Sequence, residues 1–73
     1  MTEAKWTGNF TPKKHQRVNV RMNKLGVGRI AGFFEECGFQ GVIVKLEDAP
    51  DWHKRQNNGD PHAWVFGREI EEA

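Results

Sequence analysis

Apolar and polar residues alternate along several short segments of the chain, which is the pattern of β-strands with one buried face. The first such segment covers residues 15–22 and ends in a turn at 23–26, Asn-Lys-Leu-Gly. The side chains predicted to face inward from this strand are Val18, Val20 and Met22.

Residues 26–47 have the pattern of a β-hairpin, because two apolar segments, 27–34 and 40–47, flank a glycine-containing turn at 35–38. In the first segment the alternation predicts that Ile30 and Phe34 share one face. Glycines between them indicate a strongly coiled strand, since glycine permits bulges. The side chains predicted to face inward from the second segment are Val42, Val44 and Leu46.

The second half of the chain contains a long polar stretch, residues 48–61, that shows no apolar periodicity. We expect it to be a loop without regular structure, and loops of this length are usually functional or disordered. A fourth strand is predicted at 62–66, where whichever of Trp64 and Phe66 points inward should fill the core. Gly67 ends this strand, and a tight turn and a short closing strand follow it.

Four or five short strands, one long loop and a turn before the last strand resemble the SH3-like small-barrel group. This group includes KOW, CAP-Gly and plasmid-type dihydrofolate reductase domains, and the likeness covers residues 15–72. It implies an all-β fold, a single small barrel of about five antiparallel strands. The domain then spans residues 13–73, and residues 1–12 form a flexible or loosely docked tail that can lay Trp6 and Phe10 on the barrel. An OB-like barrel is the alternative fold.

A chain of 73 residues with one cysteine, Cys37, cannot form an intramolecular disulfide and buries only a thin core. Oligomerisation is a common remedy for this, so a homo-oligomer is one possibility. A single cysteine favours a reducing, cytoplasmic location. No segment approaches the roughly 20 apolar residues of a membrane span, so no membrane partner is expected.

The net charge of +1 hides an asymmetry, because residues 1–34 carry seven basic residues and one acidic residue, whereas residues 35–73 carry four and nine. Much of the positive charge lies on or beside the first two strands. Such a stripe could contact the phosphates of a nucleic acid, or it could be the solvated face of a strand. The residues of this stripe are Lys13, Lys14, Arg17, Arg21, Lys24 and Arg29.

Trp52 has the least core-like surroundings of the aromatic residues, because charged side chains flank it in the long loop. An exposed aromatic side chain offers stacking or apolar contact to a ligand. The leading hypothesis is therefore a non-enzymatic module that binds a protein or peptide here, although Trp52 could instead pack over a barrel edge. The predicted ligand-binding residues are Trp52, Phe33, Arg29, His53 and Arg55.

No cofactor or metal is predicted. The loop residues Asp51, His53, Asp60 and His62 match no familiar ligand spacing, and Cys37 has no obvious histidine partner that would make it a nucleophile. A third hypothesis is a small oligomeric reductase, because the tail 7–10, the basic first strand and the hairpin resemble the layout of plasmid-type dihydrofolate reductases. Those enzymes use a Val-Gln-Ile-Tyr segment on a late strand. The matching residues 64–67, Trp-Val-Phe-Gly, contain neither glutamine nor tyrosine, so we expect no enzymatic activity.

Overall fold

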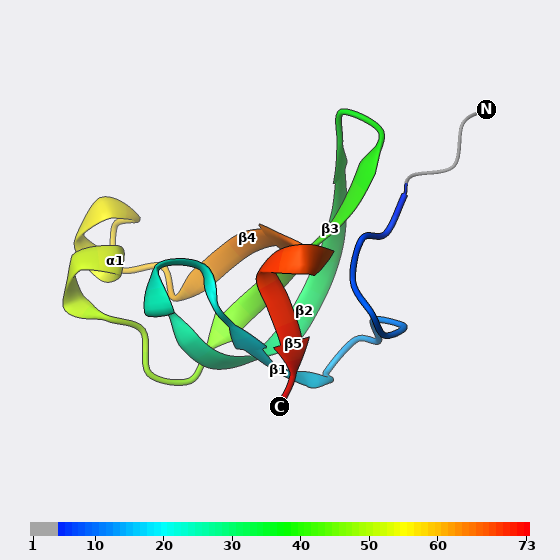
Figure 1. The fold of residues 1–73 in the computed structure, drawn as a ribbon. Helices are drawn as coiled ribbons and strands as arrows, with labels where there is room; N and C mark the ends of the chain where they lie inside the picture. The colour runs from blue at the N-terminus through cyan, green and yellow to red at the C-terminus, as the bar shows by residue number, and fades with distance from the viewer. Residues whose placement is uncertain (1–4) are drawn as a thin grey trace.

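The computed structural model describes residues 5–73 and contains five antiparallel strands that form one sheet in the order β4-β3-β2-β1-β5 (Figure 1). This confirms the predicted all-β class. The predicted tail residues 1–4 lie outside the described residues. The elements are β1 (Arg17–Val20), η1 (Met22–Lys24), β2 (Gly26–Glu36), β3 (Phe39–Leu46), α1 (Asp51–Gln56), β4 (His62–Phe66), η2 (Gly67–Glu69) and β5 (Ile70–Glu72).

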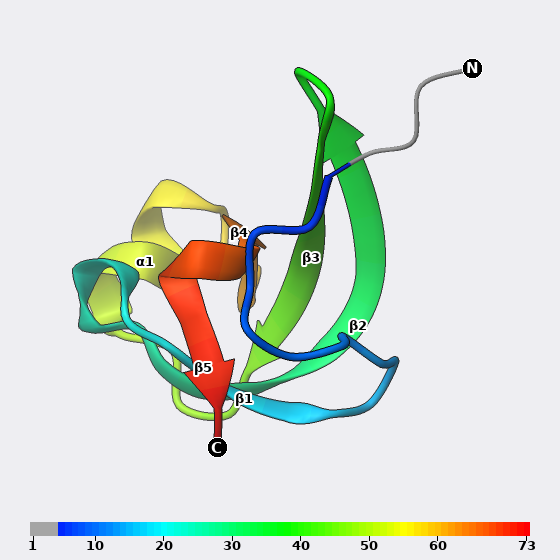
Figure 2. The same ribbon diagram turned by 45° about the vertical axis from the view of Figure 1, so that its right-hand side comes forward.

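The sheet is open, so it does not close into a barrel. β4 and β5 are its two edges, and no ladder joins them within residues 5–73. β5 has only three residues and pairs only with β1, while the N-terminal segment lies beside the end of β4 (Figure 2). Lys5 there forms a parallel bridge with Phe39, and Thr7 accepts a hydrogen bond from Arg68 N–H.

The sheet curls around a small aliphatic core on its inner face. Val18 and Val20 of β1 face this core as predicted, and Ala63 and Val65 are its contribution from β4. Trp64 and Phe66 alternate with the buried Ala63 and Val65 along β4, so both aromatic side chains lie on the outer face and neither points inward. From the N-terminal segment, Trp6 and Phe10 pack against the core, and Trp6 Nε1 donates a hydrogen bond to the Phe10 carbonyl (2.6 Å).

A β-bulge at Ala31 changes which residues of β2 face the core. Ile30 pairs with the buried Val44, but the next partners are Gly32 with Ile43 and Phe34 with Gly41. The extra residue reverses the alternation, so Phe34 lies on the outer face, opposite to Ile30. The prediction that Ile30 and Phe34 share a face is therefore wrong.

The predicted hairpin turn between β2 and β3 is confirmed, but it is shorter than 35–38 because Glu35 and Glu36 belong to β2. Its two central residues, Cys37 and Gly38, both have positive φ (53° and 80°), as a two-residue turn of the primed type requires. This turn sets the register of β2 against β3, and the register decides which side chains share the outer face.

The sequence pattern predicted a loop without regular structure at 48–61. This prediction is wrong, because the stretch contains helix α1. His53 is the buried residue of this helix. Its Nε2 donates a hydrogen bond to the His62 carbonyl (3.0 Å), and Asn57 Nδ2 lies 3.4 Å from its Nδ1. A single buried histidine thus anchors the helix to the first residue of β4, a contact that apolar periodicity cannot reveal.

Candidate functional site

A row of basic side chains crosses four strands on the outer face of the sheet. Arg17 of β1 lies directly opposite Arg29 of β2, Arg29 opposite Lys45 of β3, and Lys45 opposite His62 of β4. Directly opposed residues of antiparallel strands point to the same face, and neighbouring strands lie about 4.8 Å apart. The basic row (Arg17, Arg29, Lys45 and His62) therefore spans about 14 Å across the sheet.

Carboxylates lie beside the two ends of the basic row but not beside its centre. Arg17 Nε lies 3.3 Å from Glu47 Oε1, and His62 Nδ1 lies 2.5 Å from Asp60 Oδ1. Arg29 donates a hydrogen bond to the His15 carbonyl (3.1 Å). In the part of the chain that the structure describes, neither Arg29 nor Lys45 forms an ion pair.

The contact between Asp60 and His62 at the β4 end of the basic row is part of a tight turn. Asp60 accepts hydrogen bonds from the backbone N–H (2.9 Å) and from the ring of His62. The backbone N–H of His62, and then its ring, lower the pKa of the Asp60 carboxyl below its usual value. Asp60 therefore stays ionised and fixes the orientation of His62 where β4 begins.

Aromatic side chains occupy the outer face immediately beside the basic row. Ile43 of β3 and Trp64 of β4 lie two residues further along their strands than the basic row. In the next row, Phe34 of β2 and Phe66 of β4 both lie opposite Gly41. The Phe34 ring centroid lies 5.1 Å from that of Trp64 and 5.3 Å from that of Phe66. Trp64 is 60% exposed, although Phe34 supports one side of it. We refer to the outer-face residues Phe34, Phe39, Trp64 and Phe66 as the aromatic cluster.

The structure separates the two aromatic residues that the leading hypothesis combined. Trp52 is exposed on α1, which is tied to β4 through His62, and His62 lies opposite Lys45. Phe33 lies opposite Val42, three residues and about 10 Å away along β3. Figure 1 shows α1 at one end of the molecule and the β2–β3 hairpin at the other.

The remaining residues of that hypothesis have different environments. Arg55 is exposed on α1, and Arg29 belongs to the basic row. His53 is 7% exposed and both of its ring nitrogens have hydrogen-bond partners, so it serves the packing of α1 and not a surface. The predicted binding set thus does not form one continuous site.

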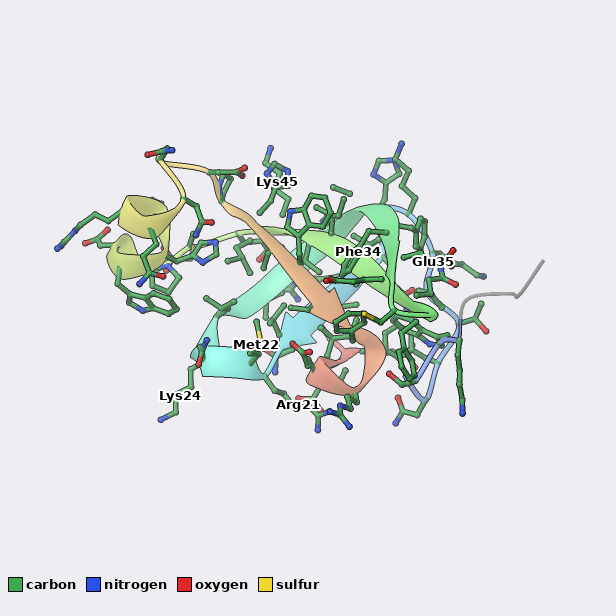
Figure 3. The ribbon with its side chains drawn as sticks, turned by 90° about the horizontal axis from the view of Figure 1, so that it is seen from above. Arg21, Met22, Lys24, Phe34, Glu35 and Lys45 are labelled. Atoms are coloured by element: carbon green, nitrogen blue, oxygen red, sulfur yellow. The ribbon has the colours of Figure 1, made fainter. Side chains whose placement is uncertain are left out.

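The predicted basic stripe is brought together only in part. Arg17 and Arg29 become direct neighbours, whereas Lys13 and Lys14 precede β1 and are exposed. Arg21 and Lys24 lie on the opposite side of the molecule from Lys45 (Figure 3). The guanidinium of Arg21 donates to the Arg68 carbonyl, which directs it away from the other cations.

Sequence reasoning missed three contributors to this face, namely Lys45, His62 and Phe34, and left open whether Trp64 or Phe66 points outward. The alternation of residues 40–47 does place Lys45 outward, and that of residues 62–66 is compatible with an outward Trp64. What joins them to Arg29 is the register of β2, β3 and β4, which is a long-range property of the sheet. The bulge at Ala31 places Phe34 on a face that the alternation of β2 does not predict.

No set of three or more metal-ligating side chains lies together within residues 5–73, and Cys37 is an exposed free thiol. None of the helices in the same range is long and apolar enough to cross a membrane. Comparison with protein families, curated proteins and solved structures finds no match.

Proposed function

We propose that this chain is a non-enzymatic module that binds single-stranded nucleic acid across the outer face of its sheet. The observation that supports this is the position of the basic row directly beside the exposed Trp64. Proteins that hold single strands without reading their sequence combine cations that follow the phosphates with aromatic side chains on which bases stack. This was the second of the sequence-based hypotheses, and it now involves β3 and β4 as well as the first two strands.

The shape of the face favours a single strand over a duplex. The outer face is convex because the sheet curls around its core (Figure 2). A flexible single strand can follow a convex surface and expose its bases to Trp64, whereas the bases of a duplex are stacked on each other and its backbone is stiff. Trp64, the member of the aromatic cluster nearest to the basic row, lies two residues, or about 7 Å, from His62 along β4, so one chain can contact both.

The charge of the row also favours an anionic ligand. Like charges placed directly opposite each other across two strands destabilise a sheet. Arg29 and Lys45 form such a pair without a protein counter-ion among residues 5–73. A phosphate bound between them would remove this repulsion, and association would release counterions from the nucleic acid.

Fluorescence anisotropy with labelled oligonucleotides of about 12 nucleotides tests the proposal at about 50 mM salt. We expect single-stranded DNA or RNA of mixed sequence to bind more tightly than the matching duplex. Absence of binding to either single strand would refute the proposal, and equal affinity for the duplex would refute the role of stacking.

A further inference from the structure

A second candidate site lies at the other end of the aromatic cluster from the basic row. A cavity of about 380 Å³ lies between the tip of the β2–β3 hairpin, the end of β4 and the N-terminal segment. Its lining includes Glu36 and Phe39 of the hairpin, Phe66 at the end of β4, and Glu69 of η2. Phe66 lies opposite Gly41, which is four residues, or about 13 Å, from Lys45 of the basic row along β3.

Segments that are distant in the sequence build the cavity, and hydrogen bonds between them hold each of them in place. The Lys5 N–H donates to the Gly38 carbonyl (2.9 Å), and the Gln40 N–H donates to the Lys5 carbonyl (2.8 Å). The Arg68 N–H donates to Thr7 Oγ1 (3.2 Å). The cavity is therefore a feature of the folded sheet and its docked N-terminal segment, and not of one mobile loop.

The lining combines aromatic rings with carboxylates. The Phe39 and Phe66 ring centroids lie 6.5 Å apart with the rings nearly perpendicular, so a ring face and a ring edge meet there. Glu69 Oε2 is buried and has no hydrogen-bond partner within residues 5–73. A carboxylate without a donor favours a ligand that brings hydrogen-bond donors to it, and a cation above all.

We infer that this cavity binds the guanidinium group of an arginine side chain presented by a peptide or protein partner. A guanidinium is planar, stacks on aromatic rings, is weakly hydrated and offers several donors to carboxylates. Glu36 and Glu69 outnumber the single cation of the lining, Arg68, and leave the cavity with a net negative charge. The cavity is thus negatively charged and its ligand is a cation, whereas the basic row is positively charged and its ligand is an anion.

An NMR titration of the whole chain with the blocked peptide Gly-Gly-Arg-Gly-Gly tests this inference. The matched control peptide carries citrulline in place of arginine, which has nearly the same shape but no charge. We expect the arginine peptide to shift the backbone amide signals of Glu36, Phe39 and Glu69, and the citrulline peptide to leave them unchanged. Equal shifts with both peptides, or shifts confined to other parts of the sheet, would overturn the inference.

Glu69→Gln and Glu36→Gln supply the variants, with Glu72→Gln on β5 as an exposed control outside the cavity. We expect Glu69→Gln to weaken binding of the arginine peptide by about tenfold, since hydrogen bonds to charged groups are strong. A dispersed amide spectrum shows whether each variant is folded, and Glu36 lies on the exposed hairpin, where substitution leaves the core intact. Unchanged affinity in both cavity variants would contradict the assignment.

Discussion

Arg29 on β2 and Lys45 on β3 are direct cross-strand neighbours on the outer face, and neither forms an ion pair within residues 5–73. Two like charges in this position lower the stability of the free protein. A phosphate bound between the two residues, as the proposed function requires, would remove this cost.

The first prediction concerns this repulsion. We expect Lys45→Gln to stabilise the free protein by about 0.2–1 kcal/mol, because it removes one of two opposed like charges. Urea unfolding at low ionic strength measures the change, and added salt should reduce it because salt screens exposed charges. Lys24→Gln, on the opposite side of the molecule, is the matched control and should leave the stability unchanged. A loss of stability in Lys45→Gln would contradict the idea that Lys45 is repelled by its neighbours.

The second prediction separates the two aromatic surfaces. Trp64→Ala should weaken binding of single-stranded oligonucleotides by about 1–3 kcal/mol, or roughly 5- to 150-fold, because the platform for a stacked base is removed. Trp52→Ala on α1 removes a tryptophan that is also partly exposed, and we expect it to leave the affinity unchanged. Anisotropy titrations of both variants measure the effect. If only Trp52→Ala weakens binding, the ligand lies on α1 and not on the outer face.

The third prediction tests the placement of Phe34 on the outer face. A Cβ atom at Gly41 would meet the Phe34 ring and would lie 2.8 Å from the Val65 carbonyl oxygen. We expect Gly41→Ala to destabilise the protein by about 1–3 kcal/mol, because the ring must move or the ladder must open. At Gly32 the nearest atom to an added Cβ is Ile43 Cδ1 at 3.6 Å, so Gly32→Ala is the control. Equal unfolding midpoints for the two variants would show that Phe34 does not cover Gly41.

The fourth prediction concerns pH. The hydrogen bonds from His62 lower the pKa of Asp60, so ionised Asp60 stabilises the turn before β4. This stabilisation is fully present above the unfolded value of about 3.9 and is lost as the pH falls through the lower folded value. We expect the His62 amide signal to titrate with a midpoint below about 3.9. In Asp60→Asn this transition should disappear, and its persistence there would assign it to another carboxyl group.

The sequence pattern predicted much of the fold because the relevant signals are local. Alternation identified the strands and the inward Val18, Val42 and Val44, and Cys37-Gly38 lies within the predicted hairpin turn. The bulge at Ala31 could not be placed, since any glycine-rich strand is compatible with a bulge at several positions. Because the extra residue at Ala31 was not predicted, Phe34 was assigned to the wrong face of the sheet.

The candidate site was less predictable because its residues come together only through strand register. Arg29, Lys45 and Trp64 belong to three different strands, and nothing in their local sequence relates them. His53 was predicted to be a surface residue because it lies between Trp52 and Lys54 in a polar segment. Its burial depends on a hydrogen bond to a residue nine positions away.

The salt dependence of single-strand binding tests the central claim most directly. For single-stranded nucleic acid, the logarithm of the affinity falls linearly with that of the salt concentration, with a slope of about 0.7 for each phosphate that the protein neutralises. Lys45→Gln and Lys24→Gln each remove one exposed lysine charge, but only Lys45 lies on the outer face. We predict that Lys45→Gln lowers the magnitude of the slope by about 0.7 and that Lys24→Gln leaves it unchanged. Equal slopes for the wild type and Lys45→Gln would contradict a nucleic-acid interface on this face.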